Sequence, residues 1–465
     1  MALSIFIDVP VSLIPATHYT IDNIFFPVLE DINIVDDFNI FRQCEKKILY
    51  CHNNSRYLTE NFGLQNALII LLDDWAIAYF SRLRSYDVNR IIWINKIPCL
   101  FPSNNFTGTS SKSSTFPFDL FSASFFFLSC YQELVIQQRD AKGRVPLRET
   151  LQHQLGCIRT PIVNEYLTIF LEAASALWKC AFKFKPMPNG ESAFCAISHD
   201  VDHIDCTTGQ YFGHLIHERR RLNWGTASTA AIVRNAMGRK YIFSMMAKKE
   251  NHFNVHSTHF FLSDYPSAAH RDFANTLASE YRDSLCEIGH HISDRSIFEN
   301  SLPQDRDRFS ANFGNSRGAR VHTLRFETFE LFRQLENQGY RYDSSLMFAE
   351  DIGYRTGFTY PHYLFDFANR RAFDVIEIPL NIMDTTLVDQ KYLNLPDDQA
   401  EKTIFQALKT AISYGGGLTL LIHNSFFYVR TPERLKMYER LLLFLSQQNV
   451  GIGTCEQLYS WRVGK

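Results

Sequence analysis

Short apolar segments alternate with amphipathic helical segments from Gly190 to the end of the chain, and no other feature limits the possible folds as much. The apolar segments have the length of buried strands, and the stretches between them repeat apolar residues at helical spacing. Such alternation predicts an α/β fold with a parallel sheet, either an open sheet or a barrel. The predicted strands are 193–197, 257–262, 287–289, 319–322, 375–378, 418–422 and 450–453, and the predicted helices are 270–282, 326–338, 400–414 and 433–448.

The residues before Gly190 follow a different pattern. Short β-like segments are separated by polar turns, and two prolines and a glycine in 185–190 end the last helical segment. We therefore expect two domains, an N-terminal α+β domain at 1–185 and a strand–helix domain at 190–465. The β-like segments are 67–72 and 91–94, and the predicted helices are 118–133 and 162–184.

Two carboxylates stand at the end of the first predicted strand of the second domain. Asp200 and Asp202 follow the apolar segment 193–197 closely. Side chains at i and i+2 of an extended chain point to the same side, so both carboxylates can face one cavity. At the end of a buried strand they are costly unless they hold a metal, a proton or a substrate. A solvated turn with an Asx cap is the alternative, and the polar residues at later strand ends favour a functional site.

Polar residues also follow several later strands, and each of them alone would be assigned a structural role. In (β/α) barrels the chemistry lies at the C-terminal ends of the strands, where these residues would meet. Together with Asp200 and Asp202 they therefore predict an active site. They are His290 and His291, Arg320, His322 and Arg325, Asp343, Arg355, His423 and Asn424, and Asp384 at the end of a strand predicted within 377–384.

Composition and charge argue against several classes of function. The formal charge is −2 and no basic stripe is present, so nucleic acid is not an expected partner. No uncharged segment approaches the length of about 18 residues that a membrane span needs. The first residues lack a basic segment and are interrupted by Asp8, Pro10 and Pro15, so we expect no secretory signal. The ten cysteines form no C-x-x-C motif, as is typical of a reducing compartment, and we expect a cytoplasmic protein.

The order of these motifs resembles that of NodB-type polysaccharide deacetylases, carbohydrate esterase family 4 in the broad sense, over residues 190–465. SHDVD resembles the first motif in its spaced D-x-D form, EIGHH followed by Ser293 resembles the E-I-G-x-H segment of the second, and LIHNS resembles the terminal L-x-H motif. YDSS, GYRTG and EIPLNIMD, with FPFDLFSASFFFLSCYQE and DAKGRVP before them, are similar to a subgroup with an extra N-terminal domain. The resemblance implies a distorted (β/α) barrel of the polysaccharide deacetylase type.

The resemblance also implies roles for the site residues. Asp200 would be the general base, Arg320 would orient it, and His423 would be the general acid that protonates the leaving amine. Asp202 and His291 would bind a divalent metal, with zinc expected, which lowers the pKa of water and polarises an acetyl carbonyl. Asp343, Asn424 and Arg355 are expected to bind substrate. The planar fork of Arg355 could hold a carboxylate or phosphate, or it could pair with Asp351.

The second motif departs from the family pattern H-x-x-x-H. Arg295 stands four residues after His291 and cannot ligate a metal, and Ser296 is a poor ligand. A third protein ligand must therefore come from elsewhere. His322 is the first choice, because it stands at a strand end close to Arg320, and the alternatives are His290 and His203.

The sequence therefore predicts a metal-dependent hydrolase that removes an N-acetyl group from a sugar of a polysaccharide or of its cytoplasmic precursor. An N-acetylated saccharide is the expected partner. Two alternatives stay open: a metal-independent amide hydrolase of the same fold, and an inactive member that binds saccharide. The sequence does not indicate which sugar is the substrate or which oligomeric state the chain adopts.

Overall fold

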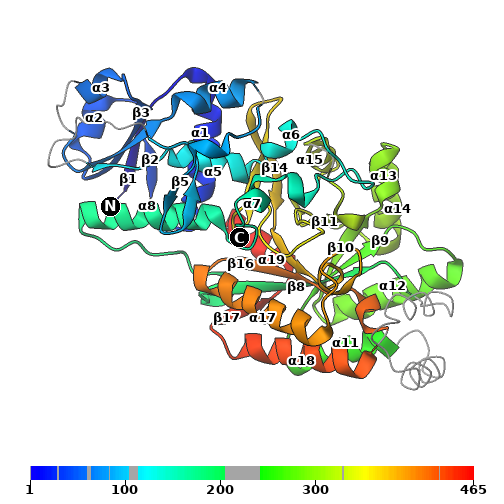
Figure 1. Cartoon of the computed structure of the whole chain (residues 1–465). Coiled ribbons are helices and arrows are strands. Elements are labelled where there is room, and N and C mark those ends of the chain that lie inside the picture. The colour runs from blue at the N-terminus through cyan, green and yellow to red at the C-terminus, as the bar shows by residue number, and fades with distance from the viewer. Residues whose placement is uncertain are drawn as a thin grey trace.

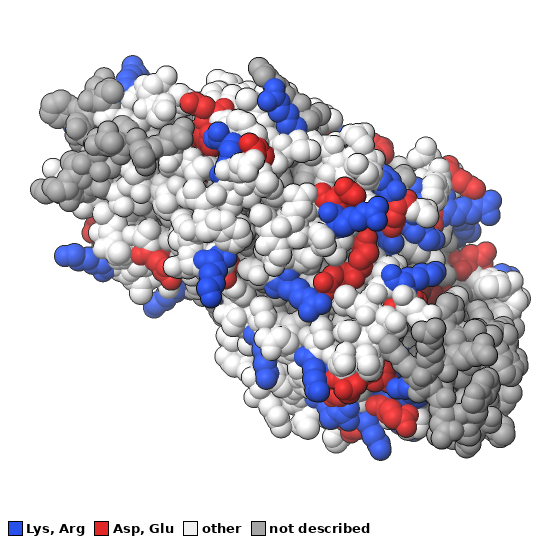
Figure 2. Space-filling model, in the orientation of Figure 1, with Lys and Arg blue, Asp and Glu red and all other residues white. Residues whose placement is uncertain are grey.

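The structure is a computed structural model that describes residues 2–28, 31–59, 64–82, 84–103, 114–204, 241–326, 329–428 and 430–464. A smaller and a larger sheet lie beside each other, the smaller in blue and the larger running from green to red in Figure 1. None of the described helices is long and apolar enough to cross a membrane. On the face shown in Figure 2, basic and acidic side chains of the described residues are interspersed.

The smaller sheet has the strand order β2-β1-β3-β4-β7, and all its pairs are parallel. One of its faces packs on α1 and α5, and the other on α2 and α3. This region is therefore a parallel α/β layer and not the expected α+β arrangement. A parallel sheet whose two faces are both apolar needs helices packed on each of them. The strands are β1 (Leu3–Asp8), β2 (Ile32–Ile34), β3 (Lys46–His52), β4 (Ala67–Leu72) and β7 (Ser114–Thr115).

Helices of the first region surround this sheet, and an antiparallel hairpin lies beside them. The helix expected over 118–133 is broken in two, because Cys130 adopts a left-handed backbone conformation with φ 51°. The elements are α1 (Ile14–Ile24), α2 (Phe38–Gln43), α3 (Arg56–Thr59), α4 (Asp74–Arg82), α5 (Leu120–Leu128), α6 (Gln132–Val135), α7 (Leu151–Gln154) and α8 (Ile162–Trp178), with β5 (Ile92–Ile94) and β6 (Ile97–Cys99).

The larger sheet has the strand order β13-β14-β12-β11-β10-β9-β8-β16-β15, and β17 pairs with the first half of β8. Every pair is parallel except β13 with β14. The strands are β8 (Ala193–Val201), β9 (Thr258–Leu262), β10 (Glu287–Ile292), β11 (Gly318–Val321), β12 (Tyr342–Asp343), β13 (His362–Asp366), β14 (Arg371–Glu377), β15 (Leu380–Met383), β16 (Gly417–Leu421) and β17 (Val450–Gly453).

This sheet is strongly curled, and one contact across it shows how strongly. β11 and β8 are separated by β10 and β9, so on a flat sheet they would lie about 14 Å apart, three times the spacing between strands. The shorter side chains of His322 and Asp202, which follow β11 and β8, nevertheless come within 3.9 Å of each other. The prediction of an α/β fold with a curled parallel sheet, here left open between β13 and β15 among the described strands, is confirmed.

Helices follow the strands of the larger sheet and cover its outer face. The helices predicted at 270–282, 326–338, 400–414 and 433–448 are confirmed as α12, α15, α17 and α18, and the strands predicted after Gly190 correspond to β8, β9, β10, β11, β14, β16 and β17. The helices are α11 (Tyr241–His252), α12 (Ala268–Asp283), α13 (Asp294–Phe298), α14 (Leu302–Phe313), α15 (Glu330–Asn337), α16 (Asp384–Val388), α17 (Asp397–Tyr414), α18 (Thr431–Ser446) and α19 (Cys455–Val463).

The two sheets share one apolar core. Aromatic rings of α1 and α5 meet the ring of Phe365 on β13, with centroids 5.2 Å from Tyr19 and 5.1 Å from Phe125. The hydroxyl of Tyr19 also donates to the backbone oxygen of Tyr363 at 2.8 Å. The boundary expected at 185–190 lies in the connection between α8 and β8. The division into two domains stays a prediction, and the shared core shows that the two regions pack against each other.

Candidate active site

A cavity of about 450 Å³ opens at the C-terminal ends of the larger sheet's strands. Asp200 and Asp202 line it from the end of β8, and His423 lines it from the end of β16. His322 reaches it from the turn after β11, and Asp384 from the residue that follows β15. The curl of the sheet thus brings side chains from distant parts of the sequence to one place.

Arg320 holds Asp200 in a fixed orientation. Its Nη1 donates to Oδ1 of Asp200 at 3.0 Å and to Oγ of Ser198 at 2.9 Å. Its Nε and Nη2 donate to the backbone oxygen and to Oγ of Ser344, at 2.7 and 2.9 Å. All these side chains are buried, so the guanidinium cannot turn away. Oδ2 of Asp200 is left facing the cavity, 4.0 Å from Nε2 of His423.

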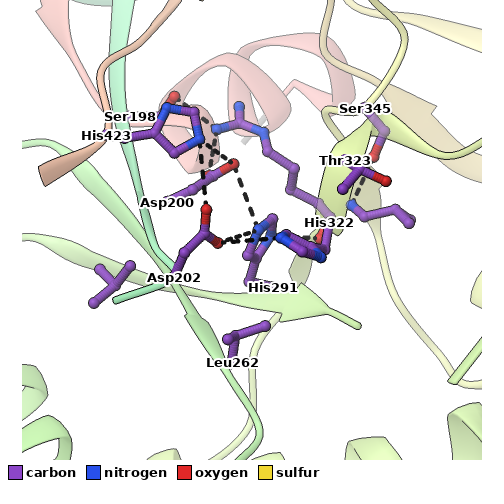
Figure 3. A network of polar contacts seen from close by, with 12 residues as sticks. Ser198, Asp200, Asp202, Leu262, His291, His322, Thr323, Ser345 and His423 are labelled. Carbon is purple, nitrogen blue, oxygen red and sulfur yellow. Dashed lines mark hydrogen bonds and ion pairs between the residues drawn. The ribbon is translucent and has the colours of Figure 1, made fainter. Parts of the chain in front are cut away.

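Asp202, His291 and His322 form a group whose ligand atoms all lie within 4.8 Å of one another. Oδ1 of Asp202 is 3.0 Å from Nε2 of His291 and 3.9 Å from Nε2 of His322. Nδ1–H of His291 donates to the backbone oxygen of Arg320 at 3.0 Å, which leaves Nε2 facing Asp202. Figure 3 shows these side chains directed toward one another from three strand ends.

Two atoms of this group are buried without a hydrogen-bond partner among the described residues, Oδ1 of Asp202 and Nε2 of His291. These two atoms lie 3.0 Å from each other, so either a proton on Nε2 of His291 or a cation held by both would satisfy them. Burial raises the pKa of Asp202, but His291, His423 and His322 outweigh it and hold that pKa well below its usual range. Ionised carboxylate and imidazole are the donors that zinc prefers, so these residues fit a divalent cation.

His423 is paired with a buried carboxylate. Its Nδ1–H donates to Oδ1 of Asp384 at 2.7 Å, and its backbone N–H donates to Oδ2 of the same group at 2.9 Å. Burial lowers the pKa of His423, but Asp384, Asp202 and Asp200 together raise it to about 10. Its Nε2 lies 3.8 Å from Asp202 and faces the cavity. His423 is therefore protonated at neutral pH and can donate a proton from Nε2.

Arg355 does not lie at the cavity, which corrects its expected role in substrate binding. It is 3% exposed, and its Nε and Nη2 both donate to the carboxylate of Glu133, each at 2.6 Å. Asp351, the other partner considered, pairs with Arg159 instead. Glu133, a residue of the first region, thus binds the guanidinium of Arg355, and this ion pair joins the two sheets.

Asp343 and Asn424 also do not line the cavity, so neither is placed to touch a substrate there. Asp343 accepts from the backbone N–H and the hydroxyl of Ser345, both at 2.8 Å, and burial raises its pKa to about 6. It thereby supports the turn whose Ser344 holds Arg320. The amide of Asn424 donates to the backbone oxygen of His203 at 2.6 Å, so it anchors the segment that follows Asp202.

The two alternative third ligands have different positions. His290 points to the other face of β10, where Nδ1 contacts the hydroxyl of Tyr340 at 2.5 Å and Nε2 lies 3.6 Å from Asp305. Neighbouring side chains on a strand face opposite sides, which explains why His290 and His291 separate. His203 lines the cavity, but the group that could hold a metal there contains His322 in its place.

A second group, His199, Glu250 and His259, could also hold a metal ion, and nothing identifies which metal. It lies on the outer side of β8, fully buried. Glu250 already accepts from Tyr438 and Ser257, each at 2.7 Å, and lies 2.8 Å from Nε2 of His199. Burial raises the pKa of Glu250, but His199 outweighs it and lowers that pKa to about 2. Side chains of the chain itself therefore already surround this carboxylate with partners.

Sequence reasoning missed residues that support the site from outside. Asp294 lies 3.5 Å from Nδ1 of His322, and the strand-end pattern that singled out His291 also covers it, because it stands just beyond β10. Lys142 and Arg144 line the cavity from the first region. They belong to DAKGRVP, a segment that the resemblance singled out without a role.

A family model described as a family of unknown function (DUF7033) matches residues 5–179, which carry the smaller sheet. No curated protein matches the chain. Among solved structures, the chain is similar to a Mycobacterium smegmatis protein provisionally named a polysaccharide deacetylase, at 14% identity and TM-score 0.40, over 60% of this chain and 92% of that one. It is also similar to Puue allantoinase, at 13% identity and TM-score 0.42, over 59% and 92%.

A third similar structure is a mutant of the peptidoglycan deacetylase PdaC from Bacillus subtilis, at 12% identity and TM-score 0.32, over 60% of this chain and 94% of that one.

Proposed function

We propose that the chain is a metal-dependent hydrolase that removes an N-acetyl group from a sugar, with the cation, expected to be zinc, held by Asp202, His291 and His322. The observation that carries the proposal is a pair of buried atoms, Oδ1 of Asp202 and Nε2 of His291, which face each other at 3.0 Å and have no hydrogen bond of good geometry among the described residues. The proposed base and acid lie next to them, with Oδ2 of Asp200 3.7 Å from Nε2 of His291 and Nε2 of His423 3.8 Å from Oδ2 of Asp202. The motif order described above supports the N-acetyl sugar as substrate.

When bound, a divalent cation at this place supplies a Lewis acid that lowers the pKa of water and polarises an acyl carbonyl. The residues of the chain supply the proton transfers. Asp200 accepts a proton from water through Oδ2, because Arg320 occupies Oδ1 and keeps the carboxylate from rotating. A base fixed in this way loses little entropy as the reaction proceeds.

His423 then donates the proton on Nε2 to the nitrogen that leaves. Asp384 accepts from Nδ1 and so fixes which nitrogen faces the substrate. The carboxylates around His423 raise its pKa to about 10, which keeps the proton in place until the amine departs. Base and acid reach the substrate from neighbouring strands, β8 and β16, with 4.0 Å between Asp200 Oδ2 and His423 Nε2.

Metal content and acetate release together test the proposal. Purified full-length chain is loaded with Zn²⁺, desalted and analysed for metal, and acetate release is followed with N-acetylglucosamine oligosaccharides as the probe. We expect about one strongly held ion per chain, weakened in Asp202→Ala, His291→Ala and His322→Ala. Asp200→Asn should keep the ion and lose acetate release by 10²-fold or more, since it removes the base.

Asp264→Asn is the matched control, because Asp264 is exposed and its carboxylate meets Arg271 and the backbone N–H of Tyr265 at the surface, away from the cavity. Acetate release that persists without any metal would replace the proposal with a metal-independent amide hydrolase. Saccharide binding that survives Asp200→Asn, with no acetate release from the wild type, would replace it with a binding protein.

A further inference from the structure

The turn that carries His322 has an unusual backbone. Thr323 and Leu324, the next two residues, have φ of 61° and 54°. A left-handed conformation is uncommon for any residue with a side chain, and a β-branched residue such as Thr323 adopts it only where surrounding contacts impose it. His322, the third candidate ligand, therefore lies on a turn whose backbone conformation depends on contacts from other residues.

A residue of the first region holds this turn. Nη1 of Arg144 donates to the backbone oxygen of Thr323 at 2.9 Å. Arg144 is itself fixed by Asp140, which accepts from its Nε at 2.8 Å and from its backbone N–H at 2.9 Å. The backbone N–H of Asp140 donates in turn to the oxygen of Arg144 at 2.8 Å. Residues 140–144 thus form a closed, rigid turn whose guanidinium rests on the residue after His322.

A second contact of the same turn acts on the ring of His322. Nζ of Lys142 lies 3.1 Å from Oδ2 of Asp294, at the start of α13. Asp294 accepts from the hydroxyl of Thr323 at 3.0 Å, and its Oδ1 lies 3.5 Å from Nδ1 of His322. A carboxylate beside the second ring nitrogen is the usual means of orienting a metal-binding histidine. Here Asp294 occupies the Nδ1 side of the His322 ring, so Nε2 is directed toward Asp202.

We propose that residues 140–144 are a clamp that positions His322 as a metal ligand, an inference that rests on the proposed metal centre. His322 needs such a clamp more than His291 does, because its side chain is 37% exposed and that of His291 only 1%. The clamp lies within the residues matched by the family of unknown function, and it gives that region a role at a site formed by the other sheet. Arg144 and Lys142 are positioning residues, since they act through His322.

Cobalt binding by Arg144→Ala tests the clamp on the full chain. Co²⁺ is titrated while its visible absorption is recorded, and Zn²⁺ competition gives the affinity. Loss of a partner that orients a ligand costs about 10–100-fold in metal affinity, and we expect Arg144→Ala to lie in that range. Its cobalt spectrum should resemble that of His322→Ala, because both lose the same ligand. Arg148→Ala is the matched control, since Arg148 is 76% exposed and pairs only with Glu149 beside it.

The double variant Arg144→Ala/His322→Ala separates a clamp from a general loss of stability. If Arg144 acts through His322, the double variant binds Co²⁺ no more weakly than His322→Ala alone. If the losses of Co²⁺ affinity in the two single variants multiply in the double variant, the clamp is overturned. A Co²⁺ affinity and spectrum of Arg144→Ala equal to those of the wild type would also overturn it. Absence of Co²⁺ binding by the wild type would overturn the metal centre itself, which is a different result from the other two.

Lys142→Met provides a second test of the clamp if Arg144→Ala does not fold. Lys142 is 47% exposed, so its replacement leaves the packing unchanged. We expect a smaller loss of Co²⁺ affinity than for Arg144→Ala, with recovery in Lys142→Arg, which can still pair with Asp294. Equal affinity in Lys142→Met and the wild type would remove Lys142 from the clamp.

Discussion

The two groups that we propose as base and acid in the candidate site have partners of opposite charge. The guanidinium of Arg320 donates to Asp200, whereas the carboxylate of Asp384 accepts from His423. Groups whose surroundings differ in this way are suited to opposite roles, one accepting and one donating a proton. Each role was assigned from motif resemblance, and the side-chain partners now give each a physical cause.

At the same scale, Asp384→Asn should change the pH dependence of acetate release. A neutral amide no longer raises the pKa of His423, so His423 loses its proton at lower pH. The alkaline limb of the rate profile should therefore shift to lower pH, and the rate at neutral pH should fall on the order of 10²-fold. Acetate release measured between pH 5 and 11 checks this. An unchanged alkaline limb would mean that His423 is not the acid.

At the scale of elements, the strands that carry the site could be predicted, whereas several that frame it could not. The segments 193–197 and 418–422 are apolar throughout and end in polar residues, so both β8 and β16 were visible in the sequence. β12 was not predicted, because it has only two residues and owes its place to its neighbours β11 and β14. β1 and β3 mix apolar residues with Ser4, Lys46 and Lys47, and they become strands because they pair with each other and because β3 pairs with the apolar β4.

β11 should be intolerant of a single added methyl group. Gly318 pairs with Tyr342 of β12, and a Cβ at this position would overlap the tyrosine ring. The ring cannot swing aside, because its hydroxyl donates to Glu287. Gly318→Ala should therefore cost about 1–3 kcal/mol in the free energy of unfolding, measured with urea. In a Tyr342→Leu background the same change should cost clearly less, and an equal cost in both backgrounds would contradict this explanation.

At the scale of the whole molecule, the contacts between the two regions were beyond prediction. Glu133 and Arg355 are 222 residues apart in the sequence, and no periodicity indicates that one fills the fork of the other. The same holds for Arg144 and Thr323, 179 residues apart. A role in substrate binding was expected for Arg355 for that reason, because the sequence shows a guanidinium that can bind a carboxylate but does not show which carboxylate it binds.

Glu133→Ala should destabilise the whole chain. It would leave Arg355 charged and buried without its carboxylate, at a cost of about 3–5 kcal/mol. The matched control is Arg159→Ala, which breaks another pair between the two regions, with Asp351. Arg159 is 52% exposed, so we expect a cost below about 1 kcal/mol. Urea unfolding of both variants measures the difference, and equal costs would mean that the buried pair adds nothing to the union of the two sheets.

β8 carries two kinds of chemistry on its two sides. Asp200 faces the cavity, while His199 faces the helices and donates from Nδ1 to the backbone oxygen of Ile422 at 2.7 Å. Because side chains alternate along a strand, sliding β8 by one residue would exchange the two sides and place an imidazole where the base belongs. Three neighbours, β9, β16 and β17, fix its alignment. One inserted residue within 193–199 is thus the smallest genetic change that would move the cavity-facing side chains of β8 to the opposite face of the sheet.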